Sequence, residues 1–311
     1  MDKKVYLRGK IGQYWYNFTE LLVYALTARP CPAELECNVT SYGAGKQNKI
    51  YTYCRKDLKD KKKPLFIYIH GGGWISGVTP MRNRYVSEWA KKGFYCASIG
   101  YSYAPQEVFP TQIHEIFKAL DQVLEGAQKH NFDPKNVVIA GESAGGYYIS
   151  YVASVLNDRS ILDALGIEFK NIDKMKIKAL VSLSGCFDLQ RVTDTSKKQS
   201  EYPDIKMMAS TFVGKSFAET VEFLKTADAK YYSPKFTKDF PPTFAVWAVN
   251  DKLRYETFDL QEDLKALGVP CKTYKADGII GNHAWSVMPI FKKSKACLED
   301  AYEFVLNYIE K

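Results

Sequence analysis

From about residue 65 onward, short apolar runs alternate with segments whose apolar residues recur every three or four positions. The runs predict six strands, near residues 65–69, 94–99, 137–140, 178–184, 243–249 and 271–275. Helical spacing is found between them, for example over 81–91 and 109–130. A chain that alternates in this way is expected to form a mostly parallel sheet with helices on both faces.

The first 60 residues follow a different pattern. Residues 5–28 predict an amphipathic helix that is rich in aromatic residues and ends at Arg29-Pro30. Two more strands are expected near 36–42 and 49–54, joined by a turn that contains glycine, and they predict an antiparallel edge. With these two strands the expected sheet has eight.

The alternation breaks between residues 187 and 242. Residues 197–203 are loop-like and a helix is predicted over 216–226, while the chain ends in a predicted helix over 292–309. A long interruption after a core strand is typical of a lid or binding element. We therefore expect one α/β domain over residues 1–311 with a small helical cap from about 1–30 and 187–242. The alternative for the N-terminal helix is packing on the sheet.

A candidate nucleophile follows one of the predicted core strands. The strand at 137–140 runs into residues 141–145, GESAG, and then into an apolar helical stretch over 147–156. This strand, turn and helix is the context that a G-x-S-x-G nucleophile elbow requires, and it predicts an exposed Ser143 hydroxyl at the carboxyl end of the sheet. The five-residue pattern alone is weak evidence because glycine and serine are common in turns.

A glycine run follows the strand at 65–69, where His70 is followed by three glycines and Trp74. Glycines leave the peptide N–H groups accessible, and preorganised N–H donors stabilise the oxyanion that forms during acyl transfer. The run therefore predicts an oxyanion site near this strand.

The ordered pair of motifs, HGGGW at 70–74 and GESAGG at 141–146, resembles the hormone-sensitive-lipase-like esterases of the α/β-hydrolase fold. It is also similar to their acetyl- and feruloyl-esterase branch, and residues 101–105, YSYAP, with Phe109-Pro110 resemble two further signatures of the family. The resemblance implies an oxyanion hole made by the N–H groups of Gly72, Gly73 and Ala144.

The resemblance has further implications and two departures. It implies that His70 braces the glycine loop, and that the remaining catalytic groups follow the nucleophile in the order acid, then histidine. Glu142 stands where many members have aspartate, and Tyr147 stands where many have asparagine. These departures concern the subfamily, and so the substrate, rather than the mechanism.

The chain has four histidines from which to choose a general base. His70 belongs to the glycine motif, while His114 and His130 fall on a predicted surface helix. His283 stands in a loop after the last predicted strand and before the last helix, where the family keeps its base. We expect His283 to accept the proton of Ser143.

The acid is expected at the carboxyl end of the strand at 243–249. Asp251 and Leu253 match the Asp-x-Leu pattern of the family, so Asp251 is expected to orient the imidazole. Alternatively, Asp251 only caps the helix that begins near Leu253. Asp188 is the second candidate for the acid and Glu256 the third.

Together these residues predict a serine hydrolase that cleaves carboxylic esters through an acyl-enzyme, with no cofactor and no metal. Trp74, Tyr147 and Trp285 are the expected pocket residues, and their aromatic side chains favour short acyl or aryl esters. One alternative is an amidase such as an aryl formamidase with the same triad. Another is a non-catalytic ligand receptor on the same fold, although such receptors lack the catalytic histidine that His283 supplies.

Composition adds bounds on partners and location. The net charge of +8 is spread along the chain, and its densest run, 59–63, is expected to be a solvated loop rather than a nucleic-acid site. The apolar stretch 21–26 is too short for membrane insertion. Seven cysteines without a C-x-x-C pair predict buried free thiols and a cytoplasmic location. The expected partner is a small ester substrate, and the chain is expected to be a monomer or homodimer.

Overall fold

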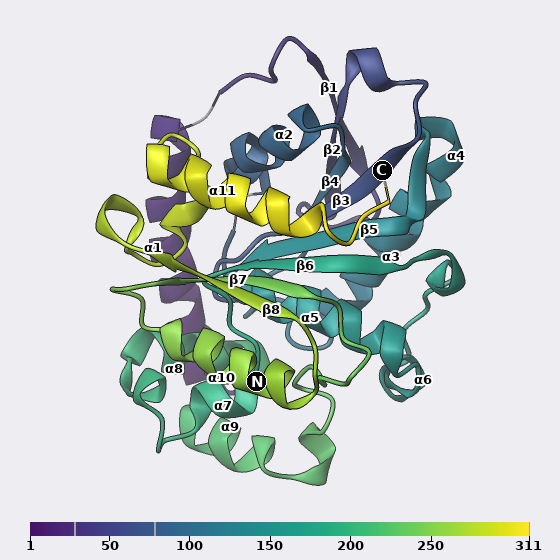
Figure 1. The fold of residues 1–311 in the computed structure, drawn as a ribbon. Coiled ribbons are helices and arrows are strands. Elements are labelled where there is room, and N and C mark those ends of the chain that lie inside the picture. The colour runs from purple at the N-terminus through teal and green to yellow at the C-terminus, as the bar shows by residue number, and fades with distance from the viewer. Residues whose placement is uncertain (28, 78, 311) are drawn as a thin grey trace.

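The computed structural model describes residues 1–27, 29–77 and 79–310, and it has a central eight-stranded sheet (Figure 1). The strand order is β1-β2-β4-β3-β5-β6-β7-β8, in which β2 is antiparallel to both neighbours and all other pairs are parallel. The expected eight strands and the antiparallel edge are confirmed. The strands are β1 Leu35–Ser41, β2 Lys49–Arg55, β3 Lys63–Ile69, β4 Tyr95–Ile99, β5 Phe132–Glu142, β6 Ile177–Leu183, β7 Thr243–Ala248 and β8 Cys271–Ala276.

Helices surround this sheet on both faces. They are α1 Lys3–Thr27, α2 Asn83–Lys91, α3 Thr111–Glu125, α4 Ala127–His130, α5 Ala144–Asn157, α6 Ser160–Leu165, α7 Leu189–Thr193, α8 Pro203–Val213, α9 Phe217–Leu224, α10 Arg254–Ala266 and α11 Lys292–Val305. The N-terminal helix is confirmed, although Ala28, its expected last residue, lies outside the described part of the chain.

Two of the expected helices differ in the structure. The single helix expected over 109–130 is wrong: α3 ends before Gly126 and α4 follows as a separate turn, because glycine disfavours the helix interior. The helix α8 was not expected. Its first residue is Pro203, which is well tolerated there because the first N–H groups of a helix have no intrahelical partner.

Alternate residues of the strands face two hydrophobic layers. On β3, Leu65, Ile67 and Ile69 pack with α3, α5 and α10, whereas Phe66 and Tyr68 pack with α2 and α11. Each face of the sheet is therefore covered by helices, as expected for parallel strands buried on both sides. This arrangement leaves the carboxyl ends of the strands as the edge where loops gather.

Helices α7, α8 and α9 lie between β6 and β7 in the chain, and α1 packs against α8 (Figure 1). The two helices approach closely, because a Cβ added at Gly9 would lie 2.4 Å from the Thr211 side chain. The buried amide of Gln13 donates hydrogen bonds to the carbonyls of Ile75 and Ala104, at 2.8 and 3.2 Å. Helix α1 is thus tied both to α8 and to the loop that follows β3.

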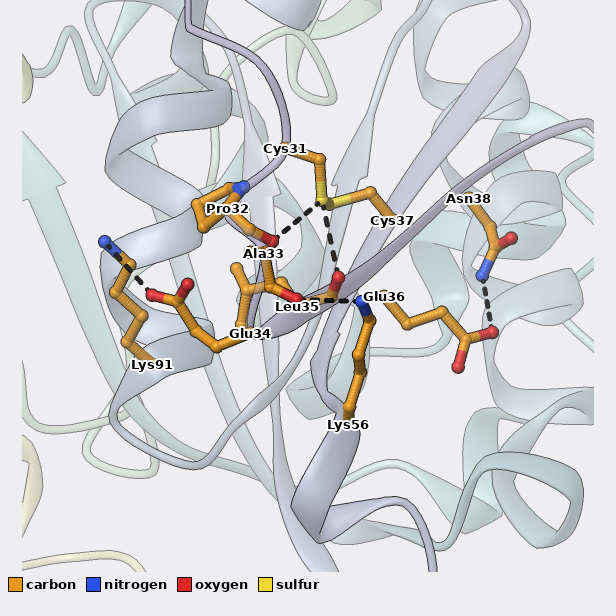
Figure 2. The surroundings of a disulfide bond; sticks show 10 residues. All are labelled: Cys31, Pro32, Ala33, Glu34, Leu35, Glu36, Cys37, Asn38, Lys56 and Lys91. Atoms are coloured by element: carbon orange, nitrogen blue, oxygen red, sulfur yellow. Dashed lines mark hydrogen bonds and ion pairs between the residues drawn. A yellow bond between two sulfur atoms is a disulfide. The ribbon is translucent and has the colours of Figure 1, made fainter.

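The expectation of free thiols is wrong for one pair, because Cys31 and Cys37 form a disulfide (Figure 2). The Leu35 N–H donates to the Pro32 carbonyl at 2.9 Å, and the turn between them brings Cys31 back beside the start of β1. Of the free thiols, Cys54 and Cys271 are partly exposed, and the other three are buried. Within the described ranges, no helix has the length and apolar character that crossing a membrane requires.

Candidate active site

Ser143 occupies the sharp turn between β5 and α5, as expected. Its backbone has φ 55° and ψ −122°, a conformation that costs energy for a residue with a side chain. The end of β6 and the loop after it hold Ser143 there: the Ser143 N–H donates to the Leu183 carbonyl at 3.2 Å, and the Ser143 carbonyl accepts from the Cys186 N–H at 3.0 Å. A strained serine fixed by surrounding hydrogen bonds is typical of a nucleophile elbow.

The glycines of the elbow allow it to contact the strand next to it. A Cβ added at Gly145 would lie 2.1 Å from the carbonyl oxygen of Ile69 in β3, which no side chain permits. On the other side, a Cβ at Gly71 would lie 2.8 Å from the Cβ of Ser143. The two glycine motifs, about 70 residues apart in the chain, are therefore in direct contact.

The glycine loop after β3 offers free backbone donors near this contact. Gly72 has φ +112°, and its carbonyl accepts from the N–H groups of Ile75 and Ser76. Within the described residues, the N–H groups of Gly72 and Gly73 have no hydrogen-bond partner. The N–H of Ala144 belongs to the first turn of α5, where helix donors are unpaired and favour negative charge.

Buried aromatic residues support this loop. His70 is buried, its Nδ1 is 2.7 Å from the Gly71 carbonyl, and its ring stacks on Tyr101 with 4.5 Å between centroids. The Tyr101 hydroxyl donates to the His70 carbonyl at 2.6 Å, and the Tyr103 hydroxyl donates to the Gly77 carbonyl at 2.5 Å. Burial lowers the pKa of His70 to about 4, so its ring is neutral and braces the loop as expected.

His283 lies between Ser143 and Asp251. Its Nε2 is 2.9 Å from the Ser143 Oγ, and its Nδ1 is 2.9 Å from Oδ2 of Asp251. Because an ionised carboxylate only accepts, Nδ1 carries the proton and Nε2 is free to accept the serine hydroxyl. Asp251 is 1% exposed and His283 is 41% exposed at its side chain.

Asp251 is not the cap of α10, which was the alternative role expected for it: the N-cap position is Leu253, and no side chain caps this helix. Oδ1 of Asp251 instead accepts from the Leu253 N–H at 2.8 Å, a bond within the turn that precedes α10. This turn bond uses one carboxylate oxygen and the imidazole of His283 uses the other.

His283 and Asp251 each shift the pKa of the other. Burial, the largest effect on His283, lowers its pKa, but the charge of Asp251 and the hydrogen bond to it outweigh burial and raise the pKa above 6.5. Burial raises the pKa of Asp251, and the charge and hydrogen bond of His283 more than reverse this, so that it falls below 3.8. Asp251 is thus ionised wherever His283 titrates.

This shift predicts the acid side of the pH profile. A base must be neutral to accept a proton, so kcat/KM for a soluble ester should rise with pH and level off only above 6.5. Below the pKa of His283 the value should fall about tenfold per pH unit. Initial rates of p-nitrophenyl acetate hydrolysis, measured in buffers of constant ionic strength, check this. A profile that is flat across the acid range would contradict a histidine base.

The other two candidate acids have different partners. Oδ1 of Asp188 accepts from the N–H of Gln190 at 2.8 Å and from the Ser233 hydroxyl at 2.6 Å, which makes it the N-cap of α7. Glu256 is fully buried and accepts from the Phe187 N–H at 3.1 Å. Burial raises the pKa of Glu256 to about 7. Within the described residues, neither carboxylate has a hydrogen bond or ion pair with His283.

The three expected pocket residues lie in two places. Trp74 stacks on Phe212 of α8. It also meets the ring of Tyr147 edge-on, and the centroids of the Trp74 and Tyr147 rings are 5.9 Å apart. Both are buried, and the Tyr147 hydroxyl donates to the Tyr232 carbonyl. Trp285 is 39% exposed and stacks on Phe291 instead. Trp74 and Tyr147 are thus joined to the helices after β6, and the pocket role of all three stays a prediction.

A buried ionic network beside Ser143 was not predicted from the sequence. Glu142 pairs with Arg82 at 2.5 Å between Oε1 and Nε, with side chains 2% and 12% exposed, and it accepts a hydrogen bond from the Tyr68 hydroxyl. Glu20 of α1 lies near this pair, and burial raises its pKa to about 7. A carboxylate inside the elbow motif signals that a cation must be buried with it, but nothing in the spacing identifies Arg82.

In the described ranges, no group of three or more histidine, cysteine, aspartate or glutamate side chains is arranged to hold a metal ion.

Comparisons with known proteins find hydrolases and esterases among the relatives of this chain. A protein of Acanthamoeba polyphaga mimivirus with the provisional name α/β hydrolase R526 is 28% identical over 268 residues. The match covers 85% of this chain and 73% of that protein. Esterase LipQ of Mycobacterium tuberculosis is 28% identical over 175 residues, 55% of this chain, and the match spans only 40% of LipQ.

Solved structures show the same fold. Inhibited esterase B of Lactobacillus rhamnosis superposes with a TM-score of 0.80 at 18% identity, covering 97% of this chain and 96% of that one. With its eight-stranded, mostly parallel sheet, the chain thus has the α/β-hydrolase fold. The model of the BD-FAE family matches residues 51–256, which contain both glycine motifs and Asp251. The match covers well over half of the sequence, and the chain belongs to the BD-FAE family.

Proposed function

We propose that this protein is a serine carboxylesterase in which Ser143, His283 and Asp251 form the catalytic triad. The observation that carries the proposal is the pair of 2.9 Å contacts through which His283 links the serine hydroxyl to a buried carboxylate. Membership of the BD-FAE family and relatives that are named esterases support ester hydrolysis.

The reaction proceeds in two steps through an acyl-enzyme. The Ser143 oxygen attacks the ester carbonyl while Nε2 of His283 takes its proton, and collapse of the tetrahedral intermediate transfers that proton to the departing alcohol. Water then attacks the acyl-enzyme by the same route and releases the acid. Asp251 stays ionised throughout, holds the Nδ1 proton and stabilises the imidazolium.

The N–H groups of Gly72, Gly73 and Ala144 are proposed to bind the oxyanion. Two of them belong to the glycine loop and have no hydrogen-bond partner among the described residues, and the third is at the first turn of α5. Loss of one such donor lowers kcat by about 10²–10³ in other acyl-transfer enzymes. The braced His70 loop keeps these donors in place before the substrate arrives, so no reorganisation is needed during the reaction.

We further propose that the substrate is a small acyl or aryl ester. A Cβ added at Gly73 would lie 2.2 Å from the sulfur of Met208, so α8 covers the glycine loop directly. The stacked Trp74 and Phe212 fill the space behind it. A cap that is packed this closely leaves little room for a long acyl chain. The helix α1 and the α7–α9 region are accordingly proposed to be the cap.

A panel of p-nitrophenyl esters from acetate to laurate tests the activity and the acyl length together. The wild-type protein should hydrolyse acetate and butyrate esters fastest and laurate at least about tenfold more slowly, because each extra methylene must fit under α8. Ser143→Ala should lose all but a trace of this activity, and a fluorophosphonate should label the wild type stoichiometrically.

Assays of N-formyl aryl amides beside this panel of esters give the outcomes that would overturn the assignment. Cleavage of N-formyl aryl amides without ester hydrolysis would make the protein an amidase with the same triad. A folded protein that neither turns over esters nor reacts with the fluorophosphonate would be a ligand receptor rather than an enzyme.

The cytoplasmic location and the monomeric or homodimeric state stay predictions from the sequence. The disulfide between Cys31 and Cys37 favours an oxidising compartment instead, since disulfides persist there and are rare where thiols are kept reduced.

A further inference from the structure

Helix α1 presents a continuous apolar stripe to solvent. The residues of this apolar stripe recur at helical spacing along one face and are each 54–69% exposed: Leu7, Ile11, Tyr14, Trp15, Phe18 and Leu22. Single exposed apolar side chains need no explanation, but a contiguous set on one helix face marks a surface that binds something. The stripe extends over about four turns of α1, the purple helix at the left of Figure 1.

The opposite face of α1 already has its intramolecular partners. Gly9 and Gly12 pack against Thr211 and Met207 of α8, and Gln13 is hydrogen-bonded to the loop after β3. Helix α1 therefore has one face that is packed within the chain and an apolar face that is left exposed. The exposed face is not needed to hold the helix in place.

Basic side chains border the apolar stripe on both sides. At about 100° per residue, Lys3 and Lys10 lie along one border and Lys4 and Arg8 along the other. From residue 3 to residue 19 the helix contains no aspartate or glutamate. A cavity of about 570 Å³ beside Lys4 and Arg8 also receives Lys206 from α8. Its two carboxylates, on Asp2 and Glu219, are already hydrogen-bonded to backbone N–H groups.

We propose that the apolar stripe of α1 docks in the plane of an anionic lipid surface. Tryptophan, tyrosine and phenylalanine, with basic residues at the borders, are the composition of helices that lie in a membrane interface. A second copy of the chain is a poorer partner, because a two-fold contact through this face would bring two basic borders together, and the carboxylates beside them, on Asp2 and Glu219, already accept backbone hydrogen bonds. The inference concerns binding at the surface, and it does not depend on the proposed ester hydrolysis.

Co-sedimentation with vesicles tests the proposal. The full chain is mixed with vesicles of phosphatidylcholine alone, or with about three parts phosphatidylcholine to one part phosphatidylglycerol. We expect about tenfold more protein bound to the anionic vesicles, and we expect added salt to reduce that difference because it screens the basic borders.

Variants separate the apolar stripe from its borders. Trp15→Ser with Phe18→Ser should lower binding to anionic vesicles about tenfold, because it removes two aromatic side chains that would be buried in the lipid surface. Lys4→Glu with Arg8→Glu should lower it by a similar factor on anionic vesicles only. Val39→Ser removes a comparably exposed apolar side chain from β1, 55% exposed, and should leave binding unchanged. Thermal melting followed by circular dichroism checks that each variant is folded.

Three results would overturn the proposal. The first is no binding of the folded wild type to either vesicle, and the second is unchanged binding by the folded Trp15→Ser, Phe18→Ser variant. The third is a dimer in sedimentation velocity that the same variant dissociates, without any vesicle binding, which would make a second copy the partner of this face.

Discussion

Replacing Asp251 with asparagine should lower kcat for p-nitrophenyl acetate by about 10⁴ while the protein stays folded. The amide cannot stabilise the imidazolium, and it can hold His283 in the tautomer whose Nε2 carries a proton and cannot accept one from Ser143. The carboxylate that is lost is 2.9 Å from Nδ1 and 1% exposed, so solvent does not screen its charge. Steady-state kinetics at a pH above the wild-type acid limb measure the effect.

Asp188→Asn is the matched control for this prediction. Asp188 caps α7 and accepts from the Ser233 hydroxyl, and the side-chain oxygen of asparagine can do both, so this replacement should cost less than about 1 kcal/mol of stability and leave kcat within a few fold of the wild type. An equal loss of kcat in Asp188→Asn, or full activity in Asp251→Asn, would move the acid to another residue.

Replacing Arg82 with methionine should destabilise the fold by about 3–5 kcal/mol. The guanidinium is 2.5 Å from a carboxylate whose side chain is 2% exposed, and removing it leaves the Glu142 carboxyl group without its counterion inside the protein. Because Glu142 precedes Ser143 directly, the same change should also disturb the elbow. Urea unfolding followed by tryptophan fluorescence, at a fixed neutral pH, measures the stability.

Two controls separate this effect from the loss of a large side chain. Adding Glu142→Gln to Arg82→Met removes the stranded charge and should recover at least half of the lost stability. Arg159→Met breaks an ion pair with Asp173 in which both side chains are more than half exposed, and it should cost less than about 1 kcal/mol. A loss in Arg82→Met no larger than in Arg159→Met would contradict the buried-charge argument.

The strands and the catalytic candidates could be predicted because their signals are local. A buried parallel strand is a short apolar run, and each of Ser143, Asp251 and His283 directly follows such a run or the loop after it. Parallel strands bring their carboxyl ends to the same edge of a sheet, so residues that follow different strands in the sequence were expected to lie close together in the structure.

What could not be predicted depends on residues that meet only after folding. Arg82 has no sequence feature that identifies it as the partner of Glu142, 60 positions away. The disulfide of Cys31 and Cys37 depends on a turn at Pro32 that carries no signal of cysteine pairing. Helix α8 has buried residues between Ile205 and Val213. Part of its buried surface packs against α1, which is nearly 200 residues away in the chain, so the sequence around α8 does not show which residues will be buried.

The hydrogen bonds of Gln13 have a consequence for the evolution of this architecture. The family match covers residues 51–256 and does not include α1, yet the Gln13 amide satisfies two carbonyls within the matched segment, those of Ile75 and Ala104. A homologue without this helix must provide another donor or admit water to both oxygens. A protein that depends on α1 in this way cannot lose it freely, since each carbonyl left buried without a partner would cost about 1–3 kcal/mol.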